Sequence, residues 1–382
     1  MVTKPTAPSV GPLYILDRND LDSLLRVLTS NGFTLIGPTL RDHAVVYDQI
    51  ESSRDFPAGW SDEQAGGTYR LIQRDDEALF GYTQGLQSWK QYLLLSHLKL
   101  WEARKNSKEY QLKEEPLQRE KTAFIGARAC ELRAMAIQDQ VLLRGPYADP
   151  YYQSQRERLF IIAVECGQAG GTCFCVSMNA GPRVEAGFDL ALTEVVEKKR
   201  HYFTVRIGSE TGRKLFAEVP HREAEEKEAA AAERIVKNTA QRMGRVLDTS
   251  DLKNLLYRNL EHPRWDDVAA RCLTCANCTQ VCPTCFCTTV VDSMDLTGKQ
   301  AERRRYWDSC FTLEYSYIHG GSVRASPKSR YRQWLIHKLA TWCDQFGESG
   351  CVGCGRCITW CPVAIDLTEE VSAIRESESQ RR

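Results

Sequence analysis

Hydrophobic and polar positions near the amino end predict an amphipathic helix over residues 20–31. Four leucines recur there at the three- and four-residue spacing of one helix face: Leu21, Leu24, Leu25 and Leu28. Asn19, whose side chain is suited to capping, stands before this segment, and Gly32 follows it. We therefore expect a helix that begins after Asn19 and buries its leucine face.

Downstream, short β-rich runs alternate with breaks at Gly, Pro and Asp. They are FTLIG at 33–37, HAVVYDQ at 43–49 and TYRLIQ at 68–73. Two later runs, TAFIGA at 122–127 and LFIIAVEC at 159–166, are almost continuously apolar, as buried strands are. The first of these leads into a helical pattern that extends from Cys130 to Leu143. This alternation predicts an α/β-type domain.

The pattern changes after residue 220. Residues 221–245 (HREAEEKEAAAAERIVKNTAQRMGR) are polar and rich in Ala, which predicts a surface or connecting helix. From Asp251 onward the pattern is helical. A chain of 382 residues is long enough for two or three domains. We expect an α+β fold with an N-terminal α/β-type domain at 1–220, a helical connector at 221–262 and a helical domain at 263–382.

Charge and hydropathy narrow the class of protein. Fifty Lys and Arg balance fifty Asp and Glu, so the chain has no overall basic field that would attract nucleic acid. No stretch approaches the roughly 18–20 apolar residues that span a bilayer. The amino terminus lacks the apolar region of a secretory signal. We expect a cytoplasmic protein with no membrane span and no nucleic-acid partner.

The sixteen cysteines are the most informative feature of the composition. They gather in three groups, at 130–175, 272–310 and 343–361. Structural disulfides are rare in a reducing compartment, whereas a metal site needs thiolates that converge on one place. The grouping therefore predicts a metalloprotein.

Two of these groups contain the same run, C-x-x-C-x-x-C-x-x-x-C-P, at 272–283 and 351–362. This is the bacterial ferredoxin run for [4Fe–4S] clusters, in which the fourth cysteine ligates the other cluster. The first cluster is expected on Cys272, Cys275, Cys278 and Cys361. The second is expected on Cys351, Cys354, Cys357 and Cys282. Two structural zinc sites are the alternative, although these usually need only two separated Cys-x-x-Cys pairs.

The insert between the two runs is long. Sixty-eight residues separate Cys282 from Cys351, and they include a helical pattern at 329–345. The domain at 263–382 is therefore expected to be a helical, ferredoxin-like dicluster domain. Glycines in the second run let backbone amides approach cluster sulfurs, where hydrogen bonds tune the reduction potential.

The upstream group predicts a third [4Fe–4S] cluster. Its four thiols lie at strand-to-loop positions: Cys130, Cys166, Cys173 and Cys175. Buried free cysteines are the alternative, because thiols pack like small hydrophobic groups.

Four other thiols have no full ligand set. Cys285, Cys287 and Cys310 favour roles in packing or beside a cluster, and a cluster with one non-cysteine ligand is the alternative. Cys343 lies on a helical pattern and is expected in the core.

Basic residues concentrate between the two runs. They are Lys299, Arg303, Arg304, Arg305, Arg324, Lys328, Arg330 and Arg332. They could dock an acidic partner or stabilise reduced clusters, and a solvated helix face is the ordinary alternative. A zinc-dependent nucleic-acid-binding module that uses these arginines is the rival function.

The sequence also lacks the common fingerprints of nucleotide and hydrolase sites. No G-x-G-x-x-G follows a strand, and neither a P-loop nor H-E-x-x-H occurs. Iron–sulfur clusters of this type pass electrons and do not perform hydride chemistry. We therefore expect a non-catalytic electron-transfer chain with no catalytic residues.

Several segments resemble one family. They are CLTCANCTQVCPTCFCTTV, WDSCFTLEYSYIHGGSVR, SRYRQWLIHKL and GCVGCGRCITWCPVAID, with GARACE, DPYY, GTCFCVSMNAGP and GFDLALTE upstream. Together they resemble the iron–sulfur β subunit of cytoplasmic NAD(P)-linked nickel–iron hydrogenases of the sulfhydrogenase type, over nearly the whole chain. One of the subunits of anaerobic sulfite reductase is similar in the same motifs. Glu131, where the family often has Asp, and Cys343 depart from the pattern.

The resemblance implies a subunit that relays single electrons. Its implied partners are the small and large subunits of a nickel–iron hydrogenase, together with a flavin NAD(P)H diaphorase subunit. The alternative partner is the rest of an anaerobic sulfite reductase.

Overall fold

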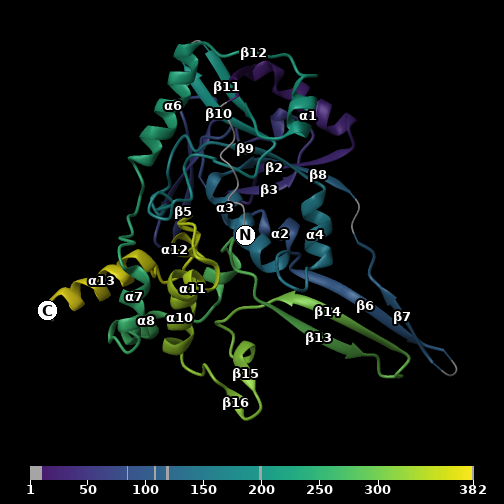
Figure 1. The fold of residues 1–382 in the computed structure, drawn as a ribbon, viewed down its shortest axis with the longest axis vertical. Coiled ribbons are helices and arrows are strands. Elements are labelled where there is room, and N and C mark those ends of the chain that lie inside the picture. Colours follow the sequence, from purple (N-terminus) through teal and green to yellow (C-terminus); the bar gives the residue numbers. More distant parts are fainter. Residues whose placement is uncertain (1–10, 84, 107–108, 118–119, 198–199, 381–382) are drawn as a thin grey trace.

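The computed structural model describes residues 11–83, 85–106, 109–117, 120–197 and 200–380. Figure 1 shows a large sheet with flanking helices at the top, a group of helices at the lower left, and a narrow sheet that projects at the lower right. Within the described residues, no helix is long and apolar enough to cross a membrane.

The large sheet has eight strands in the order β12-β1-β11-β10-β9-β8-β2-β3. Their bounds are β1 Tyr14–Asp17, β2 Phe33–Arg41, β3 Ala44–Gln49, β8 Lys121–Ala127, β9 Leu159–Val164, β10 Leu190–Glu197, β11 Arg200–Ile207 and β12 Arg222–Glu223. The four central strands, β10, β9, β8 and β2, pair in parallel, and the outer pairs are antiparallel. The strands expected at 33–37, 43–49, 122–127 and 159–166 are confirmed, and the last two are parallel neighbours.

Helices cover both faces of this sheet. The helix expected over 20–31 is confirmed as α1 Leu21–Ser30, and its four leucines are buried in a core with α5 Glu210–Phe216. On the opposite face pack α2 Lys90–Leu93, α3 Ala129–Leu142 and α4 Pro150–Glu157. The predicted cap was wrong: a 3-10 turn, Arg18–Asp20, precedes α1 and puts Asp20 at the cap position.

The helix predicted over 221–245 is shorter than expected. Residues 222–223 form the edge strand β12 on β1, and α6 spans Glu226–Ala240. Ala231 of α6 is buried against Ile15, Val195 and Tyr202 of the large sheet. Strand pairing took the first residues of the predicted helix, because the β1 edge offered unpaired backbone groups.

The prediction of an entirely helical chain after Asp251 was wrong for residues 288–307. These residues form β13 Thr288–Met294 and β14 Gln300–Trp307. They join β6 His97–Lys105 and β7 Tyr110–Glu114 in a projecting sheet of order β13-β14-β6-β7. Two small hairpins complete the strands: β4 Trp60–Ala65 with β5 Thr68–Gln73, the strand expected at 68–73, and β15 Tyr317–Ile318 with β16 Gly321–Ser322. The insert is thus split between a long-range hairpin and helices.

The C-terminal helices enclose a second core. They are α7 Leu252–Arg258, α8 Arg264–Arg271, α9 Asn277–Gln280, α10 Pro327–Ile336, the π-helical turn η4 His337–Thr341, α11 Trp342–Phe346, α12 Arg356–Thr359 and α13 Leu367–Gln380. The helical pattern predicted at 329–345 is confirmed by α10, η4 and α11, which follow one another without a break. Two short 3-10 turns lie at Ser53–Asp55 and Glu314–Ser316. Phe174, from the N-terminal part of the chain, is fully buried in this core, so the two parts pack as one body.

Candidate metal centres

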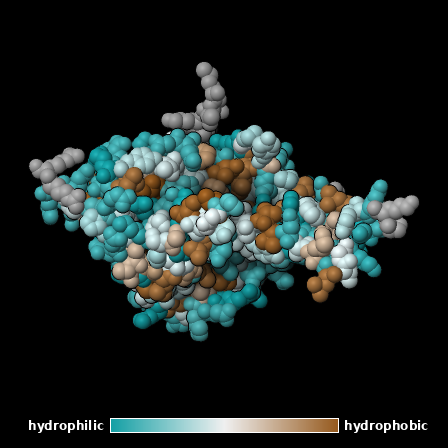
Figure 2. Space-filling model, turned by 90° about the horizontal axis from the view of Figure 1, so that it is seen from below, coloured by the Kyte–Doolittle hydropathy of each residue, from teal (hydrophilic) through white to brown (hydrophobic). Residues whose placement is uncertain are grey.

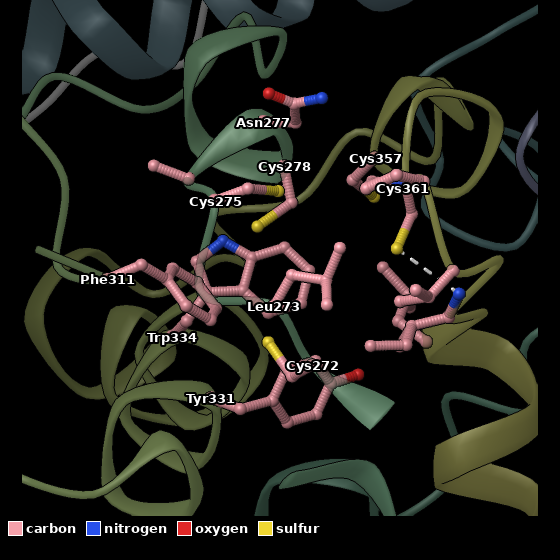
Figure 3. A pocket seen from close by; sticks show the side chains of 15 residues that line it. Cys272, Leu273, Cys275, Asn277, Cys278, Phe311, Tyr331, Trp334, Cys357 and Cys361 are labelled. Atoms are coloured by element: carbon pink, nitrogen blue, oxygen red, sulfur yellow. Dashed lines mark hydrogen bonds between the residues drawn. The ribbon is translucent and has the colours of Figure 1, made fainter. Parts of the chain in front are cut away.

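The first thiol cavity lies among the C-terminal helices (Figure 3). Cys272 follows α8, and Cys275 and Cys278 stand on the loop and first turn of α9. Cys361, from the second ferredoxin run, lines the same cavity. Phe311, Tyr331 and Trp334 form an aromatic wall on one side. The four thiols that the spacing grouped therefore surround one space.

The second thiol cavity is lined by Cys282 together with Cys351, Cys354 and Cys357. Cys282 comes from the first ferredoxin run and the other three come from the second. The exchange of the fourth cysteine between the two runs is therefore present in the fold. Lys338, from the π-helical turn η4, lies in the wall of this cavity.

The third thiol cavity contains the upstream group. Four thiols line it: Cys130 at the start of α3, Cys166 just after β9, and Cys173 and Cys175 on the following loop. Strands β8 and β9 are parallel neighbours, so the residues that follow them meet at the same edge of the sheet. The wall is completed from downstream by Thr239, Met243 and Cys354.

The three cavities lie in a row with shared walls. Cys357 lines both the first and the second cavity, and Cys354 lines both the second and the third. Close approach of two loops makes this possible. A Cβ added at Gly353 would stand 2.6 Å from the backbone oxygen of Phe174, and Phe174 N donates a 2.8 Å hydrogen bond to the Gly353 oxygen. Glycine is required here because the two backbones touch.

The comparisons with known proteins agree with this geometry. Residues 271–365 match the 4Fe-4S dicluster domain family. The chain is similar to sulfhydrogenase 2 subunit beta of Pyrococcus furiosus, with 30% identity over 259 residues that cover 67% of this chain and 75% of that protein. The chain belongs to the sulfhydrogenase β-subunit family. It is an electron-transfer iron–sulfur subunit with a [4Fe–4S] dicluster domain. No solved structure matches it.

The thiols of this β-subunit family member suit a polynuclear cluster. Burial raises the pKa of Cys278 and Cys357 well above the usual thiol value, and raises the pKa of Cys351 and Cys173 to about 12. Such thiols stay protonated until a cationic core stabilises the thiolates. In the described part of the chain, no three His, Cys, Asp or Glu side chains converge as ligands of a single metal ion would. The sulfurs stand around cavities instead.

Backbone amides already point at several of the sulfurs. Thr274 N donates to Cys272 Sγ at 3.4 Å, Gly353 N to Cys351 Sγ at 3.5 Å and Ile365 N to Cys361 Sγ at 3.3 Å. The expected approach of a glycine amide to a sulfur is therefore present at Gly353. Hydrogen bonds of this kind are among the features that set cluster potentials.

Two buried guanidinium groups stand behind the second and third cavities. Arg128, which is 1% exposed, lines the third cavity and donates to the backbone oxygens of Phe80, Tyr82 and Glu165. Arg356 is fully buried and forms a 2.7 Å ion pair with the Glu131 carboxylate.

Glu131, the residue that departs from the family pattern, is itself held on several sides. It accepts hydrogen bonds from the Tyr47 hydroxyl and the Arg128 backbone amide. The carboxylate therefore ties the loop that carries Cys130 to the second ferredoxin run.

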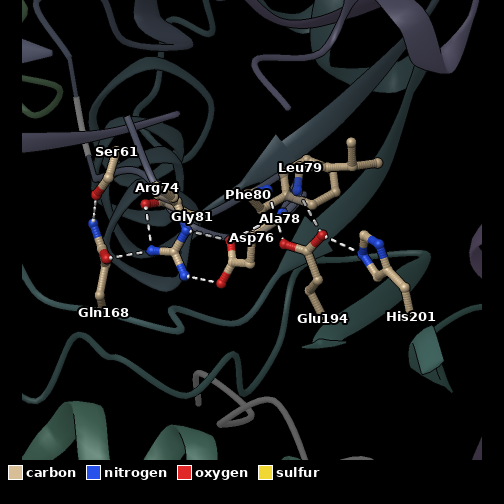
Figure 4. Close-up of polar contacts among 10 residues, drawn as sticks. All are labelled: Ser61, Arg74, Asp76, Ala78, Leu79, Phe80, Gly81, Gln168, Glu194 and His201. Atoms are coloured by element: carbon tan, nitrogen blue, oxygen red, sulfur yellow. Dashed lines mark hydrogen bonds and ion pairs between the residues drawn. The ribbon is translucent and has the colours of Figure 1, made fainter. Parts of the chain in front are cut away.

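A polar network supports the wall of the third cavity (Figure 4). Gln168, which lines this cavity, donates to Ser61 Oγ at 2.6 Å and accepts from Arg74 at 3.1 Å. Arg74 also forms a two-point pair with Asp76. The Glu194 carboxylate accepts from the amides of Leu79 and Phe80, in the loop whose carbonyls hold Arg128. Sequence reasoning missed these residues, because none belongs to a cysteine motif.

The remaining thiols do not line any of the three cavities. Cys285, Cys287 and Cys310 are half-buried beside the second cavity. Hydrogen bonds from Cys310 and Tyr315 lower the pKa of Cys287 to about 6. Cys343 was expected in the core but is only half-buried, because it faces Lys253 and Asp344 near the surface of α11.

The basic residues of the insert do not form one solvated helix face, which was the ordinary alternative. Arg303, Arg304 and Arg305 lie on strand β14, where they pair with Asp292, Glu302 and Asp149. On α10, Lys328 pairs with Asp266 and Arg332 with Glu261, while Arg330 donates to the Phe311 carbonyl. Much of this positive charge is therefore neutralised within the chain.

Proposed function

We propose that the three thiol cavities hold three [4Fe–4S] clusters. Cys272, Cys275, Cys278 and Cys361 would bind the first. Cys282, Cys351, Cys354 and Cys357 would bind the second. Cys130, Cys166, Cys173 and Cys175 would bind the third. The observation that carries this proposal is that each set of four thiols lines one cavity, and that neighbouring cavities share a cysteine.

The chain would act as a relay in a hydrogenase complex. A [4Fe–4S] cluster supplies one-electron chemistry when it is bound. The protein arranges its three sites in a row, walls them with apolar and aromatic side chains, and leaves Cys275 of the first cavity exposed. We infer that single electrons pass between the small and large subunits of a nickel–iron hydrogenase, on one side, and a flavin diaphorase subunit, on the other. The similarity to sulfhydrogenase 2 subunit beta supports these partners.

Exposed apolar side chains support a place in a larger assembly. Figure 2 shows brown patches on the face seen from below and on the projecting arm. Met294 and Leu296 are exposed on the β13–β14 hairpin, and Tyr317, Ile318 and Val323 are exposed around β15 and β16. Exposed apolar groups that gather in this way are typical of subunit contacts.

The test is metal content in site variants of the full chain, purified without oxygen. The wild-type protein should carry about twelve irons and about twelve sulfides, four of each for every cluster. Cys173→Ser should lower the iron content by about one third. Cys361→Ser should perturb the electron paramagnetic resonance signal of the site that contains Cys272, because the two residues line one cavity.

A matched control is Cys343→Ser, which should leave the iron content unchanged, because Cys343 lines none of the three cavities. About eight irons in the wild-type protein, unaltered by Cys173→Ser, would remove the third site. A colourless, zinc-loaded protein would overturn the whole proposal. Co-purification of a sirohaem subunit in place of nickel–iron subunits would favour the sulfite reductase assignment.

A further inference from the structure

Lys338 is a buried ammonium group in contact with a thiol of the second cavity. Its side chain belongs to a residue that is 6% exposed. Its Nζ lies 3.1 Å from Cys282 Sγ and 2.9 Å from Thr284 Oγ1. The ion pairs of the described residues do not include Lys338, whereas nearby Arg356 is neutralised by Glu131. The second cavity therefore has a positive charge beside it that no carboxylate balances.

The fold holds this lysine in place through its backbone as well. The Lys338 carbonyl, in the π-helical turn η4, accepts hydrogen bonds from Gly350 N at 2.8 Å and Ser349 Oγ at 3.1 Å. Thr284 Oγ1 donates to the Gly350 oxygen at 2.8 Å. Lys338 thus connects the end of the first ferredoxin run to the start of the second. A π-helical turn inside a helix is a feature often found at functional sites.

The first cavity offers a different electrostatic environment. Its thiols accept hydrogen bonds from the backbone amides of Thr274 and Ile365, and aromatic rings form much of its wall. The basic residue near it, Arg330, directs its guanidinium to the carbonyl oxygens of Phe311 and Ala325. The two dicluster sites therefore share a ligand type but differ in the charge beside the sulfurs.

We propose that Lys338 raises the reduction potential of the second site above that of the first, which makes the second site the place in the row where an electron rests. This inference rests on the proposed function. A reduced cluster carries one more negative charge, and an ammonium group in a medium of low dielectric stabilises that charge more strongly than it would in water. Lys338 is a tuning residue: it acts on the potential and transfers no electron itself.

The experiment is a redox titration of the anaerobic full chain, followed by electron paramagnetic resonance. The signal of the second site is assigned by its alteration in Cys282→Ser. In Lys338→Met, the reduction equilibrium of that signal should shift at least tenfold toward the oxidised form, about 59 mV for one electron. The signal of the first site should not move. Lys338→Arg keeps the charge and should restore most of the potential.

Two further variants keep the test decisive. Lys338→Gln removes the charge but keeps a donor near Cys282, and it replaces Lys338→Met if that protein does not fold. Lys253→Met removes a lysine that pairs with Asp344 on the surface, and it should leave every potential unchanged. An unchanged potential in a Lys338→Gln or Lys338→Met protein with full iron content would overturn the inference alone. Missing clusters in the wild-type protein would instead overturn the proposed function.

Discussion

At the scale of single residues, the two ferredoxin runs solve the same backbone problem with different side chains. Thr274 and Ala276 in the first run have φ values of 52° and 67°, and Gly353 and Gly355 at the matching positions have 65° and 77°. The left-handed conformation lets the loop fold back so that an amide reaches a cysteine sulfur. The first run accepts strain there, because only glycine visits this region without a steric cost.

This difference predicts opposite effects for two matched substitutions. Ala276→Gly should raise the free energy of unfolding by up to about 1 kcal/mol, because relief of the left-handed strain exceeds the added chain entropy. Gly355→Ala should lower it by more than about 2 kcal/mol, since its Cβ would also stand 2.5 Å from the Thr172 backbone oxygen. Urea unfolding of the holoprotein, followed by circular dichroism, measures both. Equal effects of the same sign would show that the backbone conformation is not the cause.

At the scale of elements, α6 is attached to the large sheet through one carboxylate. Glu228 in the first turn of α6 is 1% exposed and accepts from Arg222 of β12 and Arg200 of β11. It also accepts from the Glu225 amide, which caps the helix. The hydrogen bonds from Arg222 come first among the causes that lower the pKa of Glu228 from 4.5 to about 2.

Glu228→Gln should therefore lower the free energy of unfolding at pH 7 by about 1–2 kcal/mol, since both arginines are partly screened by solvent. The depressed pKa means that the ionised carboxylate stabilises the folded state above pH 4.5, and that this contribution is lost as the pH falls from 4.5 toward 2. Urea unfolding at pH 7, 5.5 and 4 should show the difference between the two proteins shrinking at pH 4. Lys227→Gln, which removes an exposed pair with Glu225, is the control and should change little.

At the scale of the whole molecule, a buried ion pair joins the two halves of the chain. Glu131 of α3 and Arg356 of α12 are 1% and 0% exposed, and they lie between the second and third cavities. A second pair between the same regions, Arg133 with Glu348, lies at the surface. The contrast allows a controlled measurement of what burial does.

Glu131→Ala should lower the free energy of unfolding by about 3–5 kcal/mol, because Arg356 loses its carboxylate while it remains buried. Arg133→Ala should cost less than about 1 kcal/mol, as exposed pairs do. A double-mutant cycle with Arg356→Met separates the pair from the capping role of Glu131. Similar losses for Glu131→Ala and Arg133→Ala would contradict the importance of burial.

Local patterns alone determined much of this molecule. Apolar runs identified β8 and β9, leucine spacing identified α1, and cysteine spacing identified three sets of thiols that each surround one cavity. These features depend on residues close in sequence or on a repeated motif. The exchange of Cys282 and Cys361 between the runs could be predicted for the same reason, because the ferredoxin run carries it.

Tertiary structure decided what depends on long-range contacts. The hairpin at 288–307 became strands because β6 offered an edge about two hundred residues away in sequence, with Ala301 opposite Ala103. The third cavity is lined by upstream thiols, but Met243 and Cys354 complete its wall. No periodicity marks Lys338 as different from any other lysine. Its contact with Cys282 exists only because packing of η4 brings residues 56 positions apart together, and such pairings leave no local signal in a sequence.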